Sequence, residues 1–329
     1  MRCSTLLFAV IACGCATQTA QNARPSEPRA PPDRARKAPD FEYDAQVALD
    51  VREDGPSRIE GEIAFELLSF ASPRGGRVPV MIVRAVRRSP TRGAAVVLQH
   101  GMGNLDKTEL LPDAVLLARA GAVAILIDGP MARPAALVPR DYANHEHDPE
   151  LWEHAVVDLR RAIDVLTARS DVDASRIGFV GHSFGGTMGA ILSQAEPRVR
   201  AFVLIGVGAS LTREILTSPR MAGVRARVPK PALDAYVAAM QTLDAEQHVA
   251  QAMPTAHMLF QFGLFDEVVE RDEAERIVVA CRSPKESHSY PTGHFITSPA
   301  AMRDRLVFLA RELELPRGDD AVARDLAGR

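Results

Sequence analysis

A serine surrounded by glycines stands at the centre of the stretch "RIGFVGHSFGGTMG", residues 176–189. Ser183 lies between Gly181 and Gly185 in the spacing Gly-x-Ser-x-Gly, and Gly186 follows directly. Alternating apolar residues precede this motif and a helix-like apolar run follows it. A strand that turns sharply into a helix exposes a serine on a strained backbone, and the glycines let neighbouring chain approach closely. The pattern predicts a nucleophilic serine, and a glycine-rich turn with an uninvolved serine is the alternative.

Two more residues of a catalytic triad follow in the order that this arrangement requires. Asp266 comes directly after the apolar run "HMLFQFGLF", and His294 follows "ESHSYPTG". A neutral imidazole can take the serine proton, and a carboxylate orients the imidazole and stabilises its charged form. Glu267 and Asp272 compete for the role of the acid, but Asp266 lies nearest the strand end. The sequence therefore predicts a triad of Ser183, Asp266 and His294.

Backbone N–H groups that could stabilise an oxyanion are expected at two places. One is the segment "HGMG", residues 100–103, where a strand ends in a bend, and the other is the start of the helix after the serine. N–H groups at such positions favour an oxygen that becomes negatively charged in the transition state. We expect the N–H groups of Met102 and Phe184 to be the two donors. His100 is expected to be structural rather than a base.

A histidine-rich segment, "NHEHDPELWEH", raises the alternative of a metal site through His145, His147, Asp148 and His154. The H-x-H-x-D-H pattern of metallo-hydrolases needs the aspartate one residue later, with a histidine directly after it. Asp148 instead follows His147 at once. We therefore expect a polar loop at the rim of the pocket, and neither a metal nor an organic cofactor.

The elements that must position these residues alternate between strands and helices. Short apolar runs ending in glycine or polar residues predict strands buried on both faces: "AAVVLQHG", "AVAILIDG", "RIGFVGHS", "RAFVLIGVG" and "HMLFQFG". Amphipathic stretches such as "LWEHAVVDLRRAIDVLTARS" lie between them and predict helices. This alternation indicates an α/β fold with a parallel sheet. Before it, "EIAFELLSFAS" and "RVPVMIVRAV" are expected to form a hairpin.

Together these segments resemble the α/β-hydrolase superfamily, and within it the dienelactone hydrolase-like and prolyl-oligopeptidase-like serine esterases. The most specific stretch is "VVDLRRAIDVLTARSDVDASRIGFVGHSFGGTMG", while "HGMG", "FGLFDEVV" and "YPTGHFI" are similar to the oxyanion, acid and histidine loops of those families. The resemblance covers roughly residues 65–315. It implies a mostly parallel sheet flanked by helices, with a small helical insertion before the acid-bearing strand, and it implies the triad and oxyanion donors already named.

The sequence also departs from these families. Dienelactone hydrolase uses a cysteine nucleophile, whereas this chain is similar to it with Ser183 at that position. The peptidase relatives carry a large N-terminal propeller, whereas only a tether and two strands precede the core here.

The first residues, "MRCSTLLFAVIACGC", contain a short apolar run followed by small residues and cysteines. The run is too short to span a bilayer. Its end, V-I-A-C at Cys13 or A-C-G-C at Cys15, is similar to the lipobox of bacterial lipoproteins, in which the cysteine becomes lipidated. More than one acyl chain gives stable membrane anchoring. We expect export and a lipid anchor, with an ordinary cleaved secretion signal as the alternative.

Composition divides the 329 residues into four expected parts. These are a signal peptide with lipobox (1–15), a disordered Pro/Arg-rich tether (16–40), the hydrolase domain (41–315) and a flexible tail (316–329). Within the domain, residues 209–253 are longer than one crossover needs and are expected to form a cap insertion. Cys281 is the single cysteine beyond the signal region, so we expect no disulfide framework and a buried, unreactive thiol.

The net charge does not indicate a particular partner, because the 39 Lys and Arg residues nearly balance the 42 Asp and Glu residues and leave a net charge of -3. Without a dense basic stripe, nucleic acid is not expected as a partner. The sequence thus predicts a serine hydrolase of the bacterial cell envelope that cleaves small carboxylic esters through an acyl-enzyme. A peptidase or thioesterase of the same fold, and an inactive binding lipoprotein, are the alternatives.

Overall fold

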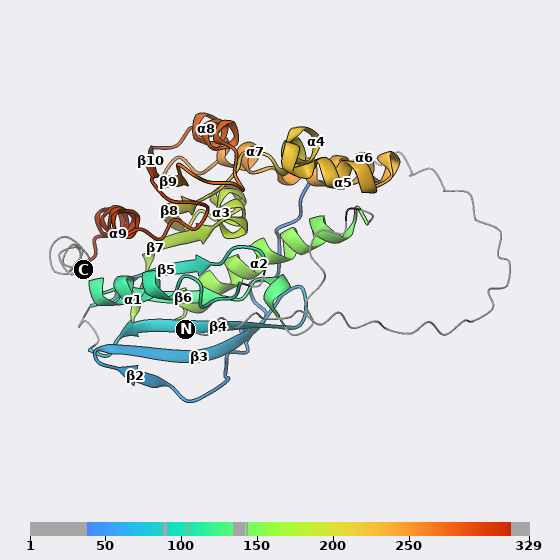
Figure 1. Cartoon of the computed structure of the whole chain (residues 1–329). Helices are drawn as coiled ribbons and strands as arrows, with labels where there is room; N and C mark the ends of the chain where they lie inside the picture. Colours follow the sequence, from blue (N-terminus) through green and yellow to red (C-terminus); the bar gives the residue numbers. More distant parts are fainter. Residues whose placement is uncertain (1–37, 88–90, 104, 134–141, 143, 317–329) are drawn as a thin grey trace, which may run out of the picture. The chain divides into compact units, whose positions relative to one another are not determined.

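The computed structural model describes residues 38–87, 91–103, 105–133, 142 and 144–316 (Figure 1). The strands in these ranges are β1 (Arg52–Glu53), β2 (Arg58–Glu60), β3 (Ile63–Ala71), β4 (Arg77–Ala85), β5 (Gly93–Gln99), β6 (Val123–Ile127), β7 (Val172–His182), β8 (Val199–Ile205), β9 (His257–Gly263) and β10 (Lys285–Tyr290). They form one sheet in the order β1-β3-β4-β6-β5-β7-β8-β9-β10, with β2 paired to β3.

The N-terminal edge of the sheet is antiparallel. Strands β3 and β4 form the expected hairpin and pair along the whole length of both strands, with Ile63 opposite Ala85 and Ala71 opposite Arg77. Its turn contains Gly75 (φ 98°) and Gly76 (φ 77°), a conformation that glycine adopts without the steric penalty of a side chain. Because β4 also pairs antiparallel with β6, the hairpin extends the edge of the parallel sheet.

The remaining strands, from β6 through β5, β7, β8 and β9 to β10, pair in parallel. The five apolar runs of the sequence are all strands here, and central residues such as Val97, Phe179 and Val203 are fully buried. Burial on both faces explains why these strands lack alternating polar residues. The predicted mostly parallel sheet is confirmed. Because parallel strands end at the same edge, the residues that follow β5, β7, β9 and β10 lie at one end of the sheet.

Helices cover both faces of the sheet (Figure 1). Helices α1 (Leu111–Ala120) and α9 (Pro299–Leu313) pack on one face of the sheet and form a hydrophobic core with the side chains of that face. Helices α2 (His147–Thr167), α3 (Phe184–Ala195) and α8 (Arg271–Ala280) contribute to the larger core on the other face. The apolar face predicted for α2 is buried, with Trp152 at 4% exposure and Ile163 at 0%. A single 3-10 turn, η1 (Pro130–Ala132), follows β6.

A helical insertion separates β8 from β9, as expected. It consists of α4 (Leu211–Thr217), η2 (Pro219–Met221), α5 (Ala222–Arg227), α6 (Lys230–Met240), η3 (Gln241–Leu243) and α7 (Ala245–Val249). Tyr236 of α6 is fully buried, and its hydroxyl donates a hydrogen bond to the carboxylate of Asp148 on α2. The ring of Tyr142 meets the ring of Tyr236 edge-on at 5.0 Å. These contacts fix the insertion to the start of α2.

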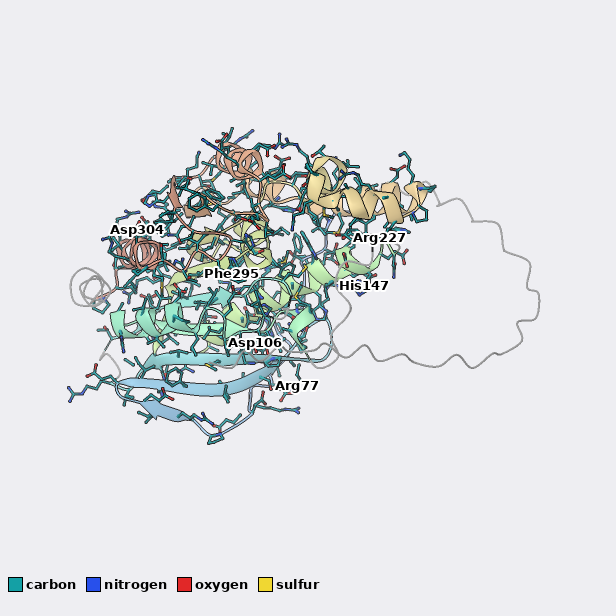
Figure 2. The ribbon with its side chains drawn as sticks, in the orientation of Figure 1. Arg77, Asp106, His147, Arg227, Phe295 and Asp304 are labelled. Atoms are coloured by element: carbon teal, nitrogen blue, oxygen red, sulfur yellow. The ribbon has the colours of Figure 1, made fainter. Side chains whose placement is uncertain are left out.

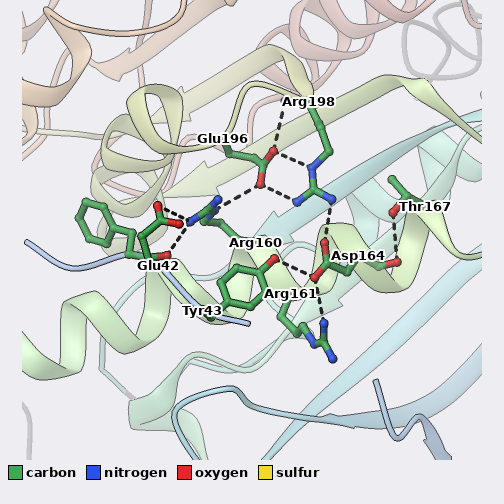
Figure 3. A network of polar contacts seen from close by, with 9 residues as sticks. Glu42, Tyr43, Arg160, Arg161, Asp164, Thr167, Glu196 and Arg198 are labelled. Atoms are coloured by element: carbon green, nitrogen blue, oxygen red, sulfur yellow. Dashed lines mark hydrogen bonds and ion pairs between the residues drawn. The ribbon is translucent and has the colours of Figure 1, made fainter. Parts of the chain in front are cut away.

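A polar network fixes the first described residues against α2 (Figure 3). The hydroxyl of Tyr43 donates to Asp164 at 2.7 Å, and Arg198 donates to the same carboxylate at 2.7 Å. Arg160 donates to the carbonyl oxygen of Phe41 at 2.6 Å. Burial and the neighbouring Asp164 raise the pKa of Tyr43 to about 12, so this hydroxyl stays protonated and keeps donating. The network anchors the segment that leads into β1.

Several expectations concern residues outside the described ranges. Cys13 and Cys15, the proposed signal peptide and most of the tether belong to residues 1–37, and the tail belongs to residues 317–329. Within the described ranges, no helix is both long enough and apolar enough to cross a membrane. Cys281 is buried, with its sulfur 3.5 Å from that of Met258, and burial raises its thiol pKa, which agrees with the expected structural role.

Candidate active site

The turn between β7 and α3 exposes Ser183 on a strained backbone. Ser183 has φ 52° and ψ -110°, in a region that residues with a side chain seldom occupy. A side chain at Gly181 would place its Cβ 2.2 Å from the carbonyl oxygen of Gly185, and one at Gly185 would lie 2.1 Å from that of Gln99. The two glycines are thus required for this turn, which we call the nucleophile elbow (residues 181–185).

The structure brings Ser183, His294 and Asp266 together in one chain of hydrogen bonds. The Oγ atom of Ser183 lies 2.9 Å from Nε2 of His294, and Nδ1 of His294 lies 2.9 Å from Oδ2 of Asp266. Because a carboxylate only accepts hydrogen bonds, Nδ1 carries the proton. Nε2 is then free to accept the serine proton, which is the tautomer that a general base requires.

Asp266 is held in place independently of His294. Its Oδ1 atom accepts hydrogen bonds from the N–H groups of Val268 (2.8 Å) and Val269 (2.9 Å), and its side chain is 4% exposed. Burial opposes its ionisation, but the bonds from His294 and from the two N–H groups outweigh burial and lower its pKa. The group therefore remains a carboxylate at neutral pH. Of the competing acids, Asp272 pairs with Arg213 at 2.6 Å instead.

The segment 100–103, which we call the oxyanion loop, follows β5 and lies against the elbow. His100 is buried, its Nδ1 donates to the carbonyl oxygen of Gly101 at 2.6 Å, and its Nε2 accepts from the N–H of Gly129 at 2.9 Å. Burial lowers its pKa, so both contacts suit a neutral ring. These bonds agree with the structural role expected for His100, because both ring nitrogens are occupied.

The expected oxyanion donors both border the site. Met102 and Phe184 line a cavity together with Ser183. Phe184 is the first residue of α3, so its N–H has no acceptor within the helix. The helix dipole also favours negative charge at this point. The positions of both residues are compatible with the predicted role.

The cavity beside Ser183 has a volume of about 80 Å³. Its wall includes Trp152 of α2, whose ring stands edge-on to that of Phe184 at 5.8 Å, and Leu211 of the insertion. Burial raises the pKa of Asp244, which also lines the cavity and accepts hydrogen bonds from Ser210 and Thr212. The sequence indicated Trp152 as a core residue of a helix, and it belongs to the histidine-rich segment that was expected at the rim of the pocket.

The histidine-rich segment divides between two other networks. His147 is the first residue of α2 (Figure 2), so most of the expected polar loop is helical, which corrects that expectation. Asp148 binds His147 and Tyr236, whereas His154 contacts Ser72 at 2.9 Å. No group of three or more His, Cys, Asp or Glu side chains in the described ranges could hold a metal ion. The helix contributes Trp152, instead of histidines, to the cavity.

The chain is similar in sequence and in fold to known proteins. A curated relative, the α/β hydrolase domain-containing protein WAV2 of Arabidopsis thaliana, is 34% identical over 87 residues, which are 26% of this chain and 28% of that protein. The chain thus matches less than a third of the length of that relative.

Solved structures share the fold. The acetyl xylan esterase from Paenibacillus sp. R4 superimposes on 82% of this chain and 90% of its own, with a TM-score of 0.67 and 20% identity. Acetyl xylan esterase 1 from Thermoanaerobacterium sp. JW/SL YS485 covers 82% of this chain and 89% of its own, with a TM-score of 0.63 and 18% identity. These likenesses show the α/β-hydrolase fold.

The family model extends over the elbow, the acid and the histidine. The model of the prolyl oligopeptidase family matches residues 143–311, more than half of the 329 residues. With the fold and this match together, the chain belongs to the prolyl oligopeptidase family and is a serine hydrolase of the α/β fold.

Proposed function

We propose that this protein is an esterase that cleaves carboxylic esters of short acyl groups through an acyl-enzyme intermediate. The observation that carries the proposal is the hydrogen-bonded chain from Ser183 through His294 to Asp266, at the border of a small cavity. Nucleophile, base and orienting acid have the mutual geometry that ester hydrolysis needs.

The first half of the proposed reaction forms the acyl-enzyme. The Oγ atom of Ser183 attacks the ester carbonyl carbon while Nε2 of His294 takes the hydroxyl proton. The carbonyl oxygen becomes an oxyanion, which the N–H groups of Met102 and Phe184 stabilise. The bond to the alcohol oxygen then breaks, and His294 returns its proton to the departing alcohol. Asp266 stabilises the imidazolium that exists between these two transfers.

The second half releases the acid. Water takes the place of the alcohol, gives its proton to His294 and attacks the acyl carbon. The tetrahedral intermediate collapses, the bond to Oγ breaks, and His294 reprotonates Ser183. No step of this cycle requires a metal or an organic cofactor.

The size of the cavity supports a short acyl group. One water molecule needs roughly 10–15 Å³ of cavity space, so about 80 Å³ accommodates roughly half a dozen water-sized groups. This small space favours an acetyl to butyryl group over a long fatty acyl chain. Acetyl is also the group named for the two structurally similar esterases, so an acetyl ester is the first substrate to test.

The test compares an ester, a thioester and anilides as substrates. Purified protein is assayed with p-nitrophenyl acetate, an acetyl thioester and peptide p-nitroanilides, and a fluorophosphonate probe reports the reactive serine. We expect ester turnover and labelling at Ser183. Faster cleavage of the anilide or the thioester than of the ester would favour the peptidase or thioesterase alternative. Absence of labelling would favour an inactive binding protein.

The location of the protein is a second part of the proposal. We infer that Cys13 or Cys15 carries a lipid and holds the domain at the bacterial cell envelope, because the preceding residues are similar to a lipobox. Replacing both cysteines with serine should abolish incorporation of a labelled fatty acid and release the protein from membranes. Continued acylation and membrane attachment of the double variant would contradict this location.

A further inference from the structure

A carboxylate outside the triad lies next to the oxyanion loop and the nucleophile elbow. Glu109 precedes α1, and its Oε2 atom accepts a hydrogen bond from the N–H of Gly101 at 2.7 Å. Its Oε1 atom lies 2.5 Å from Nδ1 of His182. The side chains of Glu109 and His182 are only 11% and 3% exposed. One side chain thus contacts both the oxyanion loop and the elbow.

His182 extends this connection to the histidine loop, residues 291–295. Its Nε2 atom is 3.1 Å from the backbone carbonyl oxygen of His294, and because a carbonyl only accepts, Nε2 donates. The ring of His182 also lies 5.0 Å from the ring of His294 and 5.2 Å from that of Phe295. His182 is therefore in contact with the base as well as next to the nucleophile in the chain.

Glu109 contacts His182 at one ring nitrogen. Nδ1 of His182 has no aligned hydrogen-bond acceptor in the described ranges, although the Glu109 oxygen is 2.5 Å away. At this distance the carboxylate oxygen of Glu109 is in direct contact with the ring nitrogen of His182. Burial opposes ionisation of Glu109, but the contact with His182 and the hydrogen bond from the Gly101 N–H outweigh burial and lower its pKa. The carboxylate is thus ionised at neutral pH.

The surroundings leave the oxyanion loop little freedom. A Cβ atom at Gly101 would lie 3.1 Å from Nδ1 of His182 and 3.4 Å from Cβ of Ser183, so the loop lies directly against the elbow. Two residues before Glu109, the N–H and the ammonium of Lys107 donate to Asp128 at 2.8 Å and 2.6 Å. These bonds fix the segment that carries Glu109, whose carboxylate binds the N–H of Gly101.

We propose that Glu109 is a positioning residue, which acts through Gly101 and His182 to keep the Met102 N–H aligned with Ser183 and His294. This inference rests on the proposed esterase function. Met102 follows Gly101 in the chain, so a shift of Gly101 moves the oxyanion donor. Loss of one such donor costs about 10²–10³ in kcat, and a displaced donor costs part of that.

The test uses Glu109→Gln, His182→Gln, the double variant and a matched control. Glu66 is the control, because its side chain is 16% exposed and ion-paired to Arg84 at 2.6 Å, yet it lies on β3 away from the elbow. We expect Glu109→Gln to lower kcat about 10–100-fold with KM changed less than about twofold. His182→Gln should have a similar effect, and the double variant should be little worse than the worse single variant. Glu66→Gln should retain kcat within about twofold.

Melting temperatures separate positioning from folding. The inference is overturned if Glu109→Gln keeps the kcat of wild type. It is also overturned if a control variant with the same melting temperature as Glu109→Gln loses as much kcat, or if the losses of kcat from Glu109→Gln and His182→Gln are additive in the double variant. Should Glu109→Gln fail to fold, His182→Gln removes the same pairing from the other side and is judged by the same criteria.

The rate of fluorophosphonate labelling distinguishes this inference from the proposed function, because it needs no assumption about the ester. A wild-type chain that the probe does not label at Ser183 overturns both. A labelled wild type whose Glu109→Gln variant is labelled equally fast overturns the role of Glu109 alone. Slower labelling of Glu109→Gln than of Glu66→Gln is the result we expect.

Discussion

Nε2 of His294 lies 2.9 Å from Oγ of Ser183, although 111 positions of the chain separate the two residues. The contact forms because β7 and β10 run in the same direction in the sheet, so that the segments following them meet at one edge. A proton can pass between these two atoms without any rearrangement of the backbone.

Substitution of Gly185 tests whether the elbow depends on its glycines. In Gly185→Val the new Cβ atom would lie 2.1 Å from the carbonyl oxygen of Gln99, which is backbone and cannot move aside cheaply. We expect a melting temperature lower by several degrees and a large loss of activity, since overpacking costs about 1–3 kcal/mol or more. Gly55→Val is the control, because its Cβ would meet only Leu67 at 3.6 Å. An equally stable, active Gly185→Val protein would contradict the close packing.

The assignment of the acid is tested by comparing neighbouring carboxylates. Asp266→Asn should lower kcat by about 10³–10⁴, because the amide no longer fixes the useful tautomer of His294 or stabilises its charged form. Glu267→Gln and Asp272→Asn should remain close to wild type. Steady-state kinetics on one ester decide the question. Near-normal turnover in Asp266→Asn together with its loss in Glu267→Gln would reassign the acid.

The lowered pKa of Asp266 also predicts how stability changes with pH. Its carboxyl binds a proton more weakly in the folded chain than at its ordinary pKa of 3.8. The carboxylate therefore stabilises the fold above about pH 3.8, and this contribution disappears as the pH falls through the lowered pKa. The difference in melting temperature between wild type and Asp266→Asn should shrink between pH 6 and about pH 3. A difference that is independent of pH would argue against the stabilising contacts of this carboxylate.

The sequence was sufficient to predict that Ser183, Asp266 and His294 lie together, because each follows a strand of the parallel sheet and the ends of such strands meet at one edge. It was insufficient for Glu109 and His182, because their pairing depends on how the oxyanion loop folds back on the elbow. No local periodicity reports that contact. For the histidine-rich segment, the expected loop is wrong because α2 already begins at His147. Within that helix, His147 contacts Asp148 and His154 contacts Ser72.

The proposed selectivity for short acyl groups is testable through the cavity wall. On p-nitrophenyl esters of increasing length, kcat/KM should fall beyond about four acyl carbons. Leu211→Ala should enlarge the cavity and move the preferred length upward, because Leu211 lines it. Leu216→Ala, on the same helix but 49% exposed, should leave the preference unchanged. A wild type that prefers octanoate, or a Leu211→Ala variant with an unaltered profile, would contradict the assignment of this cavity to the acyl group.

The most direct test of the account is Ser183→Ala, measured against wild type in three ways. Melting temperature should change little, since the substitution removes one partly exposed hydroxyl and leaves no buried cavity. Turnover of p-nitrophenyl acetate should fall by at least about 10³, because the acyl-enzyme can no longer form. Intact-mass analysis should detect the fluorophosphonate adduct on wild type and none on the variant. A Ser183→Ala protein that still hydrolyses the ester at a rate near wild type would show that Ser183 is not the nucleophile.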